Sequence, residues 1–207
     1  MFIYFWDRLL VMAGSLDYSE LLAIMGFIIT QEKAIGHDYE MPDILVETGT
    51  YQGQTPMRLS SYFGDIYTIE GDPLHFKRTV NVLPANVCSL FGESPIILRE
   101  LASLIQRPCV FYLDAHWWAN GDITRAELEG KTPLLDELNV IGPRVFDDLI
   151  IIDDMRLFGR VTPDTGDWSA ITVCRILEKI THVKRFFEKE DRFVVHKQVQ
   201  IKNLSQK

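Results

Sequence analysis

Six acidic residues stand at or just after the ends of short apolar segments, which makes them candidates for chemistry. They are Glu47, Glu70, Glu93, Asp114, Asp153 and Asp154. A carboxylate can accept hydrogen bonds from hydroxyl groups, take up a proton, or bind a divalent cation together with other carboxylates. Each of these roles requires that the surrounding elements bring the acids to a common edge of the fold.

The elements that carry these acids are of two alternating kinds. Short β-branched segments at 44–48, 65–70, 87–91, 109–114 and 149–153 have the character of strands. Helix-like stretches at 53–63, 73–82, 94–105, 133–141 and 168–180 come between or after them. This alternation predicts a parallel sheet with helices on both faces. The carboxyl ends of parallel strands share one edge, where open α/β sheets bind ligands, so we expect all six acids there.

The two ends of the chain depart from this alternation. Residues 15–20 have the character of a helix start, and the apolar residues after them predict a helical layer within residues 1–40. Segments 183–188 and 192–201 are separated by three residues, too few for a crossover, which predicts an antiparallel hairpin. We therefore expect a single domain, residues 1–207, with a Rossmann-like core at 41–207. Its sheet has seven strands and is mostly parallel.

Length and composition are those of an ordinary globular domain. The chain has 207 residues, of which 47% are hydrophobic and 24% charged, and its net charge is −8. This acidity opposes nucleic-acid binding, because phosphates attract basic surfaces. Cys88, Cys109 and Cys174 lie far apart in apolar runs, which predicts buried, reduced thiols in a reducing compartment.

The apolar stretches near the N-terminus do not predict a membrane segment. Residues 1–14 are interrupted by Asp7 and Arg8 and lack the basic start of a secretory signal. The apolar run 21–30 is shorter than the roughly 20 residues that span a bilayer. We expect a soluble, cytoplasmic chain with no membrane span.

The C-terminal part is basic, in contrast to the rest of the chain. From residue 175 to the end, nine Lys or Arg stand against four acids, so the first 174 residues carry a net charge of −13. The basic hairpin could hold a partner or an anionic substrate such as a nucleotide-linked sugar. Alternatively, its lysines protect a solvated sheet edge against pairing with another strand.

A glycine-containing turn follows the first strand. Gly49 and Gly53 permit a tight turn, and the next helix start offers free N–H groups to a carboxylate or phosphate. An ordinary strand-to-helix turn would have the same residues. Tyr51 stands where a dinucleotide site would have a further glycine, which favours a nucleoside with a small charged tail.

Acids after the next two strands are compatible with such a ligand. Glu70 lies about 20 residues beyond the glycine turn, where a carboxylate can accept both hydroxyls of a ribose. Glu93 and Ser94 form a further turn with an acid and a hydroxyl. The alternative for this region is helix capping, because Asp72 before Pro73 has the pattern of an N-cap.

The stretch Glu-Thr-Gly-Thr-Tyr-Gln-Gly-Gln-Thr at 47–55 resembles the first motif of class I S-adenosylmethionine-dependent methyltransferases. Within that class it is similar to small metal-dependent O-methyltransferases of the catechol- and sugar-modifying type, whose motif is Glu-x-Gly-x-Tyr-x-Gly-x-Ser/Thr. The resemblance covers residues 43–159 and the terminal hairpin. It implies S-adenosylmethionine as cofactor, with Glu70 at its ribose and Glu93 and Ser94 at the adenine edge. The implied cofactor-binding residues are Glu47, Gly49, Thr50, Tyr51, Gly53, Thr55, Glu70, Gly71, Glu93, Ser94 and Asp114.

Three aspartates after the fourth and fifth strands are candidates for a metal site. Carboxylates on adjacent strands can converge, and oxygen ligands select Mg, Mn or Ca. In the resembled family, acids at these places hold a divalent metal, which implies Asp114, Asp153 and Asp154 as its ligands here. The alternative is that Asp153 and Asp154 cap the next segment or pair with arginines at 156 and 160.

Residues just after Asp114 could serve the acceptor. His116 has a pKa close to neutrality and could take a proton from a hydroxyl, a role that Asp114 could also fill. The catechol enzymes have a Lys near this point, so His116 departs from the resemblance. Trp117 and Trp118 could stack on a sugar or aromatic substrate or belong to the core. The polar stretch 119–132 is either a substrate loop or an ordinary surface loop.

Together these features predict an enzyme that transfers a methyl group from S-adenosylmethionine to a hydroxyl of a sugar or glycan, with a divalent metal. Two alternatives are compatible with the same residues. One is O-methylation of a catechol-like phenol, and the other is a non-catalytic cofactor-binding module of a larger glycan-processing protein. The expected partner is a small-molecule or glycan acceptor, and the sequence predicts no oligomeric state.

Overall fold

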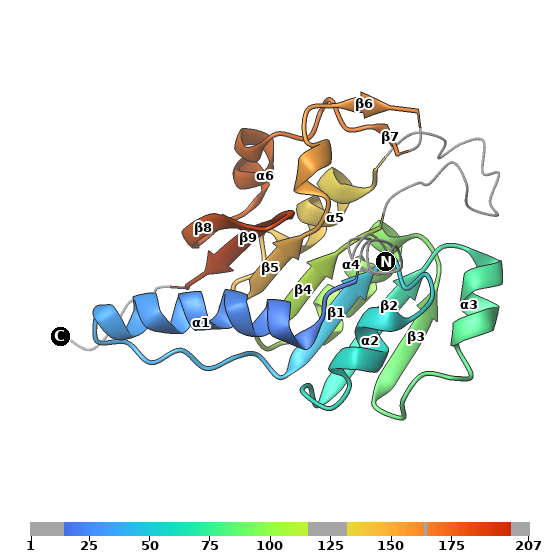
Figure 1. Ribbon diagram of the computed structural model, residues 1–207, viewed down its shortest axis with the longest axis horizontal. Helices are drawn as coiled ribbons and strands as arrows, with labels where there is room; N and C mark the ends of the chain where they lie inside the picture. Colours follow the sequence, from blue (N-terminus) through green and yellow to red (C-terminus); the bar gives the residue numbers. More distant parts are fainter. Residues whose placement is uncertain (1–14, 116–131, 164, 200–207) are drawn as a thin grey trace, which may run out of the picture.

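The computed structural model describes residues 15–115, 132–163 and 165–199, which form a seven-stranded sheet between helical layers (Figure 1). The strand order is β3-β2-β1-β4-β5-β9-β8. Strands β1 to β5 are parallel, whereas β9 runs antiparallel to both β5 and β8. The strands are β1 (Ile44–Thr48), β2 (Asp65–Glu70), β3 (Val87–Phe91), β4 (Val110–Leu113), β5 (Leu149–Ile152), β8 (Val183–Lys189) and β9 (Arg192–Lys197). The predicted fold class is confirmed.

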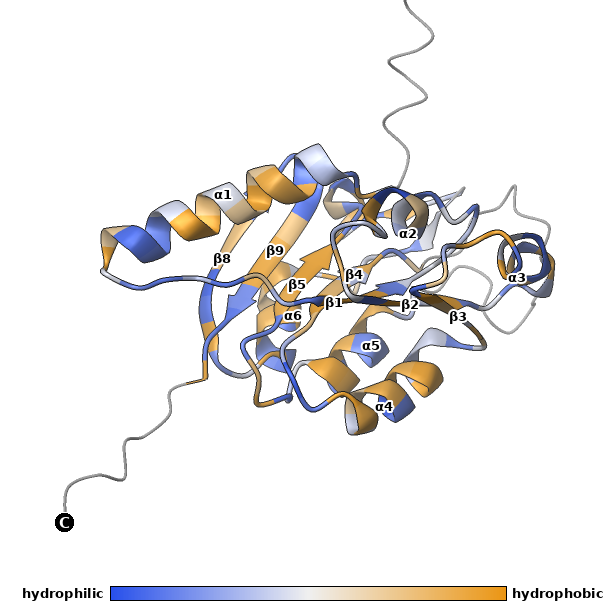
Figure 2. Cartoon of the chain, turned by 90° about the horizontal axis from the view of Figure 1, so that it is seen from below, coloured by the Kyte–Doolittle hydropathy of each residue, from blue (hydrophilic) through white to orange (hydrophobic). Residues whose placement is uncertain are grey.

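Helices cover both faces of the sheet. The helices are α1 (Tyr18–Ala34), α2 (Gln54–Leu59), α3 (Pro73–Thr79), α4 (Ser94–Leu104), α5 (Leu134–Ile141) and α6 (Val173–Lys179). In the edge-on view of Figure 2, α1 and α2 lie on one face, and α4, α5 and α6 lie on the other. Each face has its own core of buried apolar side chains, one with α1 and α2 and one with α4 to α6.

The register of the central strands brings their carboxyl ends level. Thr48 in β1 pairs with Leu113 in β4, and Leu113 pairs with Ile152 in β5. The ladder continues one step further, because the N–H of Asp114 donates to the Thr48 carbonyl and the N–H of Asp153 donates to the Leu113 carbonyl, both at 3.1 Å. β1, β4 and β5 are buried along their whole length. The residues that follow these strands therefore start from a rigid edge.

Helix α1 is capped at its start and bound to the sheet near its other end. Asp17 and Glu20 form a capping box that satisfies the first N–H groups of the helix. Near the other end, the buried Glu32 carboxylate binds Lys184 and Arg185 of β8, the latter at 2.9 Å. The predicted N-terminal helix is thus present within the described part of the chain.

Differences from the sequence prediction occur after β5. The stretch 168–180 is helical only from Val173, because the Thr172 hydroxyl accepts the Arg175 N–H and caps the helix there. Before it lie a short 3₁₀ helix, η1 (Met155–Leu157), and a two-stranded ribbon that the sequence did not predict, β6 (Val161–Thr162) with β7 (Gly166–Asp167).

Two further predictions concern the cysteines and the membrane. All three cysteines are free, but only Cys109 is buried; Cys88 and Cys174 are exposed, so the expectation that all three are buried is wrong. Among the described residues, no helix combines the length and the apolar character that crossing a bilayer requires.

Candidate functional site

The turn between β1 and α2 forms one side of the candidate site. Gly49 has φ +86°, and a Cβ added to it would lie 2.6 Å from the carbonyl oxygen of Asp114 at the end of β4. Gly53, at φ +73°, begins α2. At Gly49, only glycine permits this backbone together with so close an approach to the residue after β4, and at Gly53 the positive φ itself favours glycine. The backbone of the turn therefore explains why glycine stands at both predicted positions.

Glu70 connects this turn to the one that follows β2. Its Oε2 accepts the Tyr51 N–H at 2.7 Å, and its Oε1 accepts the Asp72 N–H at 2.8 Å. Burial raises the pKa of Glu70, while these two backbone donors favour its ionised form. A carboxylate has lone pairs for further donors, so Glu70 can still accept hydroxyl groups of a ligand.

The other predicted residues of these turns surround Glu70. Tyr51 has a positive φ of 47°, and its exposed ring packs on His75 with 4.7 Å between ring centroids. Gly71 lies next to Gly92 in the turn after β3. Asp72 accepts the N–H groups of Leu74 and His75, so the expected helix cap is observed there.

Glu47 lies inside the sheet rather than on its surface. Its carboxyl accepts the Thr68 hydroxyl at 2.5 Å, and Thr68 is bonded to Thr50 at 2.6 Å. Thr55, which is also buried, hydrogen-bonds Glu47 as well. Burial raises the pKa of Glu47 to about 8, so it is mostly uncharged at neutral pH. This network fixes the β1–α2 turn from within.

Asp114 and Asp153, which follow β4 and β5, share one tyrosine. The Tyr112 hydroxyl donates to Asp153 Oδ2 at 2.6 Å and lies 3.4 Å from Asp114 Oδ2. Burial raises the pKa of Asp114 well above its usual range, and the neighbouring Asp153, Asp154 and Glu47 raise it further. On the other side, Arg192 Nε lies 3.6 Å from Asp153 Oδ1.

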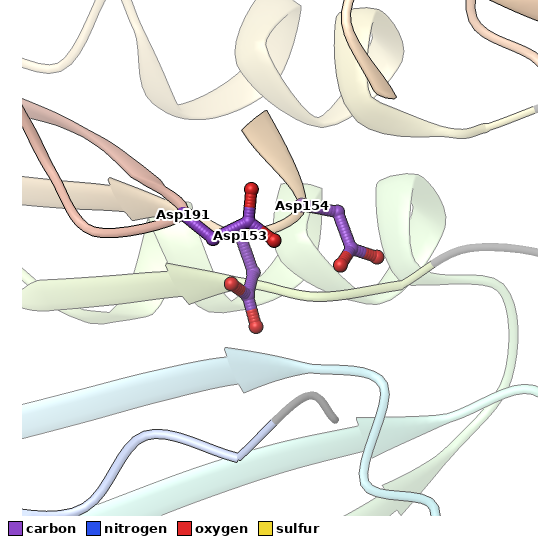
Figure 3. Close-up of side chains that lie close together, drawn as sticks. All are labelled: Asp153, Asp154 and Asp191. Atoms are coloured by element: carbon purple, nitrogen blue, oxygen red, sulfur yellow. The ribbon is translucent and has the colours of Figure 1, made fainter. Parts of the chain in front are cut away.

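Asp154 belongs to a second acidic group near the end of β5. Figure 3 shows Asp153 and Asp154 after β5 and Asp191 from the turn between β8 and β9; their carboxylate oxygens lie within 4.8 Å of one another. Arg156 pairs with Asp154 at 2.5 Å and also with Asp191. Of the three predicted metal ligands, Asp153 and Asp154 belong to this group, and its third member is Asp191 instead of Asp114. The pairing of Asp154 with Arg156, which the sequence offered as the alternative, is observed.

A small pocket opens between α5, the ends of β4 and β5, and the turn after β7. Its walls include four apolar side chains and three carboxyl groups: Leu113, Leu134, Ile152, Trp168, Asp114, Asp153 and Glu137. Glu137 was not among the sequence-predicted residues. Its Oε1 accepts the hydroxyl of Ser94, the predicted adenine-edge residue that begins α4 just after Glu93.

Glu137 is almost completely buried, with 1% of its surface exposed. Burial raises its pKa to about 7, although the hydroxyls of Ser94 and Thr48 favour the ionised form. In the sequence, Glu137 appears only as an acid about one turn into a predicted helix. The rotation of α5, which makes this side chain point inward, is visible only in the structure.

The remaining predicted residues cannot be placed. His116, Trp117 and Trp118 lie outside the described residues, as does most of the stretch 119–132. Their roles as base and substrate contacts stay predictions.

Comparison with known proteins adds information on the fold. No protein-family model and no curated protein sequence matches the chain. Among solved structures, it is similar to yhhF of Escherichia coli, proposed to be a methyltransferase. That match has a TM-score of 0.50 and 11% identity over 91% of this chain and 89% of the other. This likeness shows a shared fold.

Two further structures resemble the chain slightly less. Human methyltransferase-like protein 13 in complex with SAH has a TM-score of 0.49 and 14% identity, over 79% of this chain and 74% of that one. An S-adenosylmethionine-dependent methyltransferase from Anabaena variabilis has a TM-score of 0.48 and 11% identity, over 93% of this chain and 92% of that one.

Proposed function

We propose that this protein transfers a methyl group from S-adenosylmethionine to a hydroxyl of a small-molecule acceptor, with a sugar or glycan as the first candidate. The observation that carries the proposal is the position of Glu70. Two backbone N–H groups hold its carboxylate at the end of β2, beside the Gly49 turn. An acid at this place suits the two hydroxyls of a ribose.

The residues around Glu70 fit a cationic nucleoside. In the turn with Gly49 and Gly53, both glycines have a left-handed backbone, and Gly49 lies directly against the end of β4. Glu70 ends β2, and Asp114 and Asp153 follow β4 and β5 at the same edge, where acids attract a positively charged sulfonium group. Methylation in this setting breaks the bond from sulfur to the methyl carbon, forms a bond from oxygen to carbon, and releases the hydroxyl proton.

That proton needs an acceptor in the protein. Asp114 is the described candidate, because its carboxyl lines the pocket and can accept a proton when it is ionised. His116 is the second candidate proposed from the sequence. The contribution of the protein is then to position the acceptor oxygen in line with the methyl group, and to hold the released proton.

The proposal also includes a divalent metal. Asp114, Asp153 and Asp154 would hold it, and when bound it would lower the pKa of the acceptor hydroxyl. Arg192 and Arg156 already compensate Asp153 and Asp154, so a cation would compete with them. We therefore derive no step through a metal. Treatment with EDTA and re-addition of Mg²⁺ tests its role: restored turnover supports it, and full turnover in EDTA contradicts it.

Binding of S-adenosylmethionine, measured by calorimetry, tests the cofactor assignment. We expect Glu70→Ala to weaken binding at least tenfold, because the variant removes the hydroxyl acceptor and loosens both turns that Glu70 connects. Glu100→Ala, which changes an exposed acid of α4, is the matched control and should bind like the wild type. If the wild-type protein does not bind S-adenosylmethionine, the proposed function is wrong.

The acceptor class needs a separate measurement. A product assay with sugars and with catechol-like phenols, under the same conditions, distinguishes the first candidate from the phenolic alternative. Methylation of phenols alone would replace the sugar assignment while leaving the cofactor assignment intact. Cofactor binding without methylation in either panel would favour a non-catalytic binding module.

A further inference from the structure

Glu137, on α5, joins two residues that belong to different turns of the candidate site. Its Oε1 accepts the hydroxyl of Ser94, the residue that begins α4 after β3. The hydroxyl of Thr48, the last residue of β1, hydrogen-bonds the same carboxyl. Thr48 has none of its surface exposed, whereas Ser94 keeps 7% exposed. Of the two hydroxyl residues, only Ser94 can therefore also meet a bound ligand.

The carboxylate of Glu137 fixes the direction of these hydrogen bonds. An ionised carboxyl group has no proton to give, so a hydroxyl bonded to it must be the donor. A serine hydroxyl has a single proton and two lone pairs. Because the proton of Ser94 points to Glu137, the Ser94 oxygen can only accept a hydrogen bond from a ligand.

The strand order places the base of the proposed cofactor near the start of α4. Glu70, the proposed ribose acceptor, ends β2, which lies between β1 and β3. Under the proposed function, the sulfonium group lies on the side of β1 and β4, near Asp114. The base then extends in the opposite direction, toward the turn after β3. This turn is within reach, because Gly71 after β2 lies next to Gly92 after β3.

We infer that Glu137 determines which base the site selects, by holding the Ser94 hydroxyl as a hydrogen-bond acceptor. The inference rests on the proposed function and deepens it. Adenine has an exocyclic amino group, a donor that suits this acceptor. Hypoxanthine has a carbonyl oxygen at the same place, which would face the Ser94 oxygen with no proton between them. Glu137 is a positioning residue, since it acts on the base through Ser94.

The affinities of two nucleosides that differ only in the base test the inference. The probes are S-adenosylhomocysteine and S-inosylhomocysteine, measured by calorimetry at pH 8.5. Glu137 is mostly ionised at this pH, because its pKa is about 7. We expect the wild type to bind the adenine compound about tenfold more tightly or better. Equal affinities would overturn the inference, whereas failure of both compounds to bind would contradict the proposed function itself.

Variants assign the preference to Glu137. The amide of Glu137→Gln can turn either to accept from Ser94 or to donate to it, so Ser94 can serve either base, and the affinity ratio should fall at least fivefold. Ser94→Ala removes the acceptor and should also lower the ratio, and adding Glu137→Gln to it should lower it no further. Asp136→Asn, which changes the exposed neighbouring acid, should keep the wild-type ratio. A lowered ratio in Ser94→Ala with an unchanged ratio in Glu137→Gln would contradict the role of Glu137.

Discussion

Two buried glutamates change their charge near neutral pH, each for the same reason. Glu47 lies inside the sheet with a pKa of about 8, and Glu137 lies under the pocket with a pKa of about 7. In both cases burial opposes the ionised form more strongly than the neighbouring hydroxyls support it. The acids at this edge therefore do not all carry a full charge at once, which allows several of them to lie close together.

Glu47 should make the stability of the fold depend on pH. Its ordinary pKa is 4.5 and its folded pKa is about 8, so between these values the folded state binds more protons than the unfolded state. Its stabilising effect is complete below about pH 4.5 and is lost as the pH rises through about 8, by up to about 1.4 kcal/mol per pH unit.

Urea unfolding at pH 5, 6.5 and 8 measures this effect. We expect the unfolding free energy of the wild type to fall more steeply across this range than that of Glu47→Gln, in which the group cannot ionise. Glu100→Gln, on the exposed face of α4, should follow the wild type. Parallel curves for Glu47→Gln and the wild type would contradict the assignment.

At the scale of elements, the strands were the most predictable part. β1, β4 and β5 are buried on both faces, so each appears in the sequence as an apolar run that ends at an acid or a glycine. The ribbon β6–β7 was missed because two-residue strands have no periodicity of their own. The sequence predicts a helix from Trp168 because this residue begins an apolar stretch. In the structure Trp168 is a core residue that precedes α6, so its apolar character reflects core packing.

The candidate site was predictable only in part, for a related reason. The strand ends, and with them Glu70, Asp114 and Asp153, follow from the alternation of strands and helices. Glu137 depends on how α5 is rotated, and Asp191 depends on β9 pairing with β5, where Ile152 meets Phe193. Contacts between distant elements decide both, and local patterns do not contain them.

The β1–α2 turn provides a prediction at this scale. In Gly49→Ala the new Cβ would lie 2.6 Å from the Asp114 carbonyl oxygen, and the residue would keep a positive φ. Gly36→Ala is the matched control, since its φ is +76° but nothing lies within 4 Å of the added Cβ. Both variants carry the backbone cost of about 1–2 kcal/mol, and only the first adds the clash.

We therefore expect thermal unfolding to show a clearly larger loss of stability for Gly49→Ala than for Gly36→Ala. The same variant should bind S-adenosylmethionine more weakly, because the turn must move away from β4. Equal stability of the two variants would mean that β4 yields easily to the turn, and that the close approach is not a constraint.

At the scale of the whole molecule, cations of the basic C-terminal part pair with acids of the rest of the chain. Lys184 and Arg185 bind Glu32 of α1, and the buried Lys197 lies 3.6 Å from Asp148. Arg192 reaches both Glu20 and Asp153. Lys184, Arg185, Arg192 and Lys197 thus have internal partners, which gives part of the basic character of this segment a role in folding.

Arg192 has the widest reach of these cations, because it joins α1, the hairpin and the acid after β5. In Arg192→Gln, Asp153 loses its compensating charge in a buried place, and α1 loses a contact near its capped start. Removing one partner of a buried ion pair costs about 3 kcal/mol or more. Arg175→Gln, an exposed arginine of α6, should cost far less.

Urea unfolding of both arginine variants at low and high salt tests this arrangement. The loss for Arg192→Gln should persist in 1 M NaCl, since buried pairs are poorly screened. With Arg192 gone, the pKa of Asp153 should rise further, because the arginine is the main group that opposes the effect of burial. A salt-sensitive or negligible loss would place Arg192 among ordinary surface charges, and the acidic edge would then need another source of compensation.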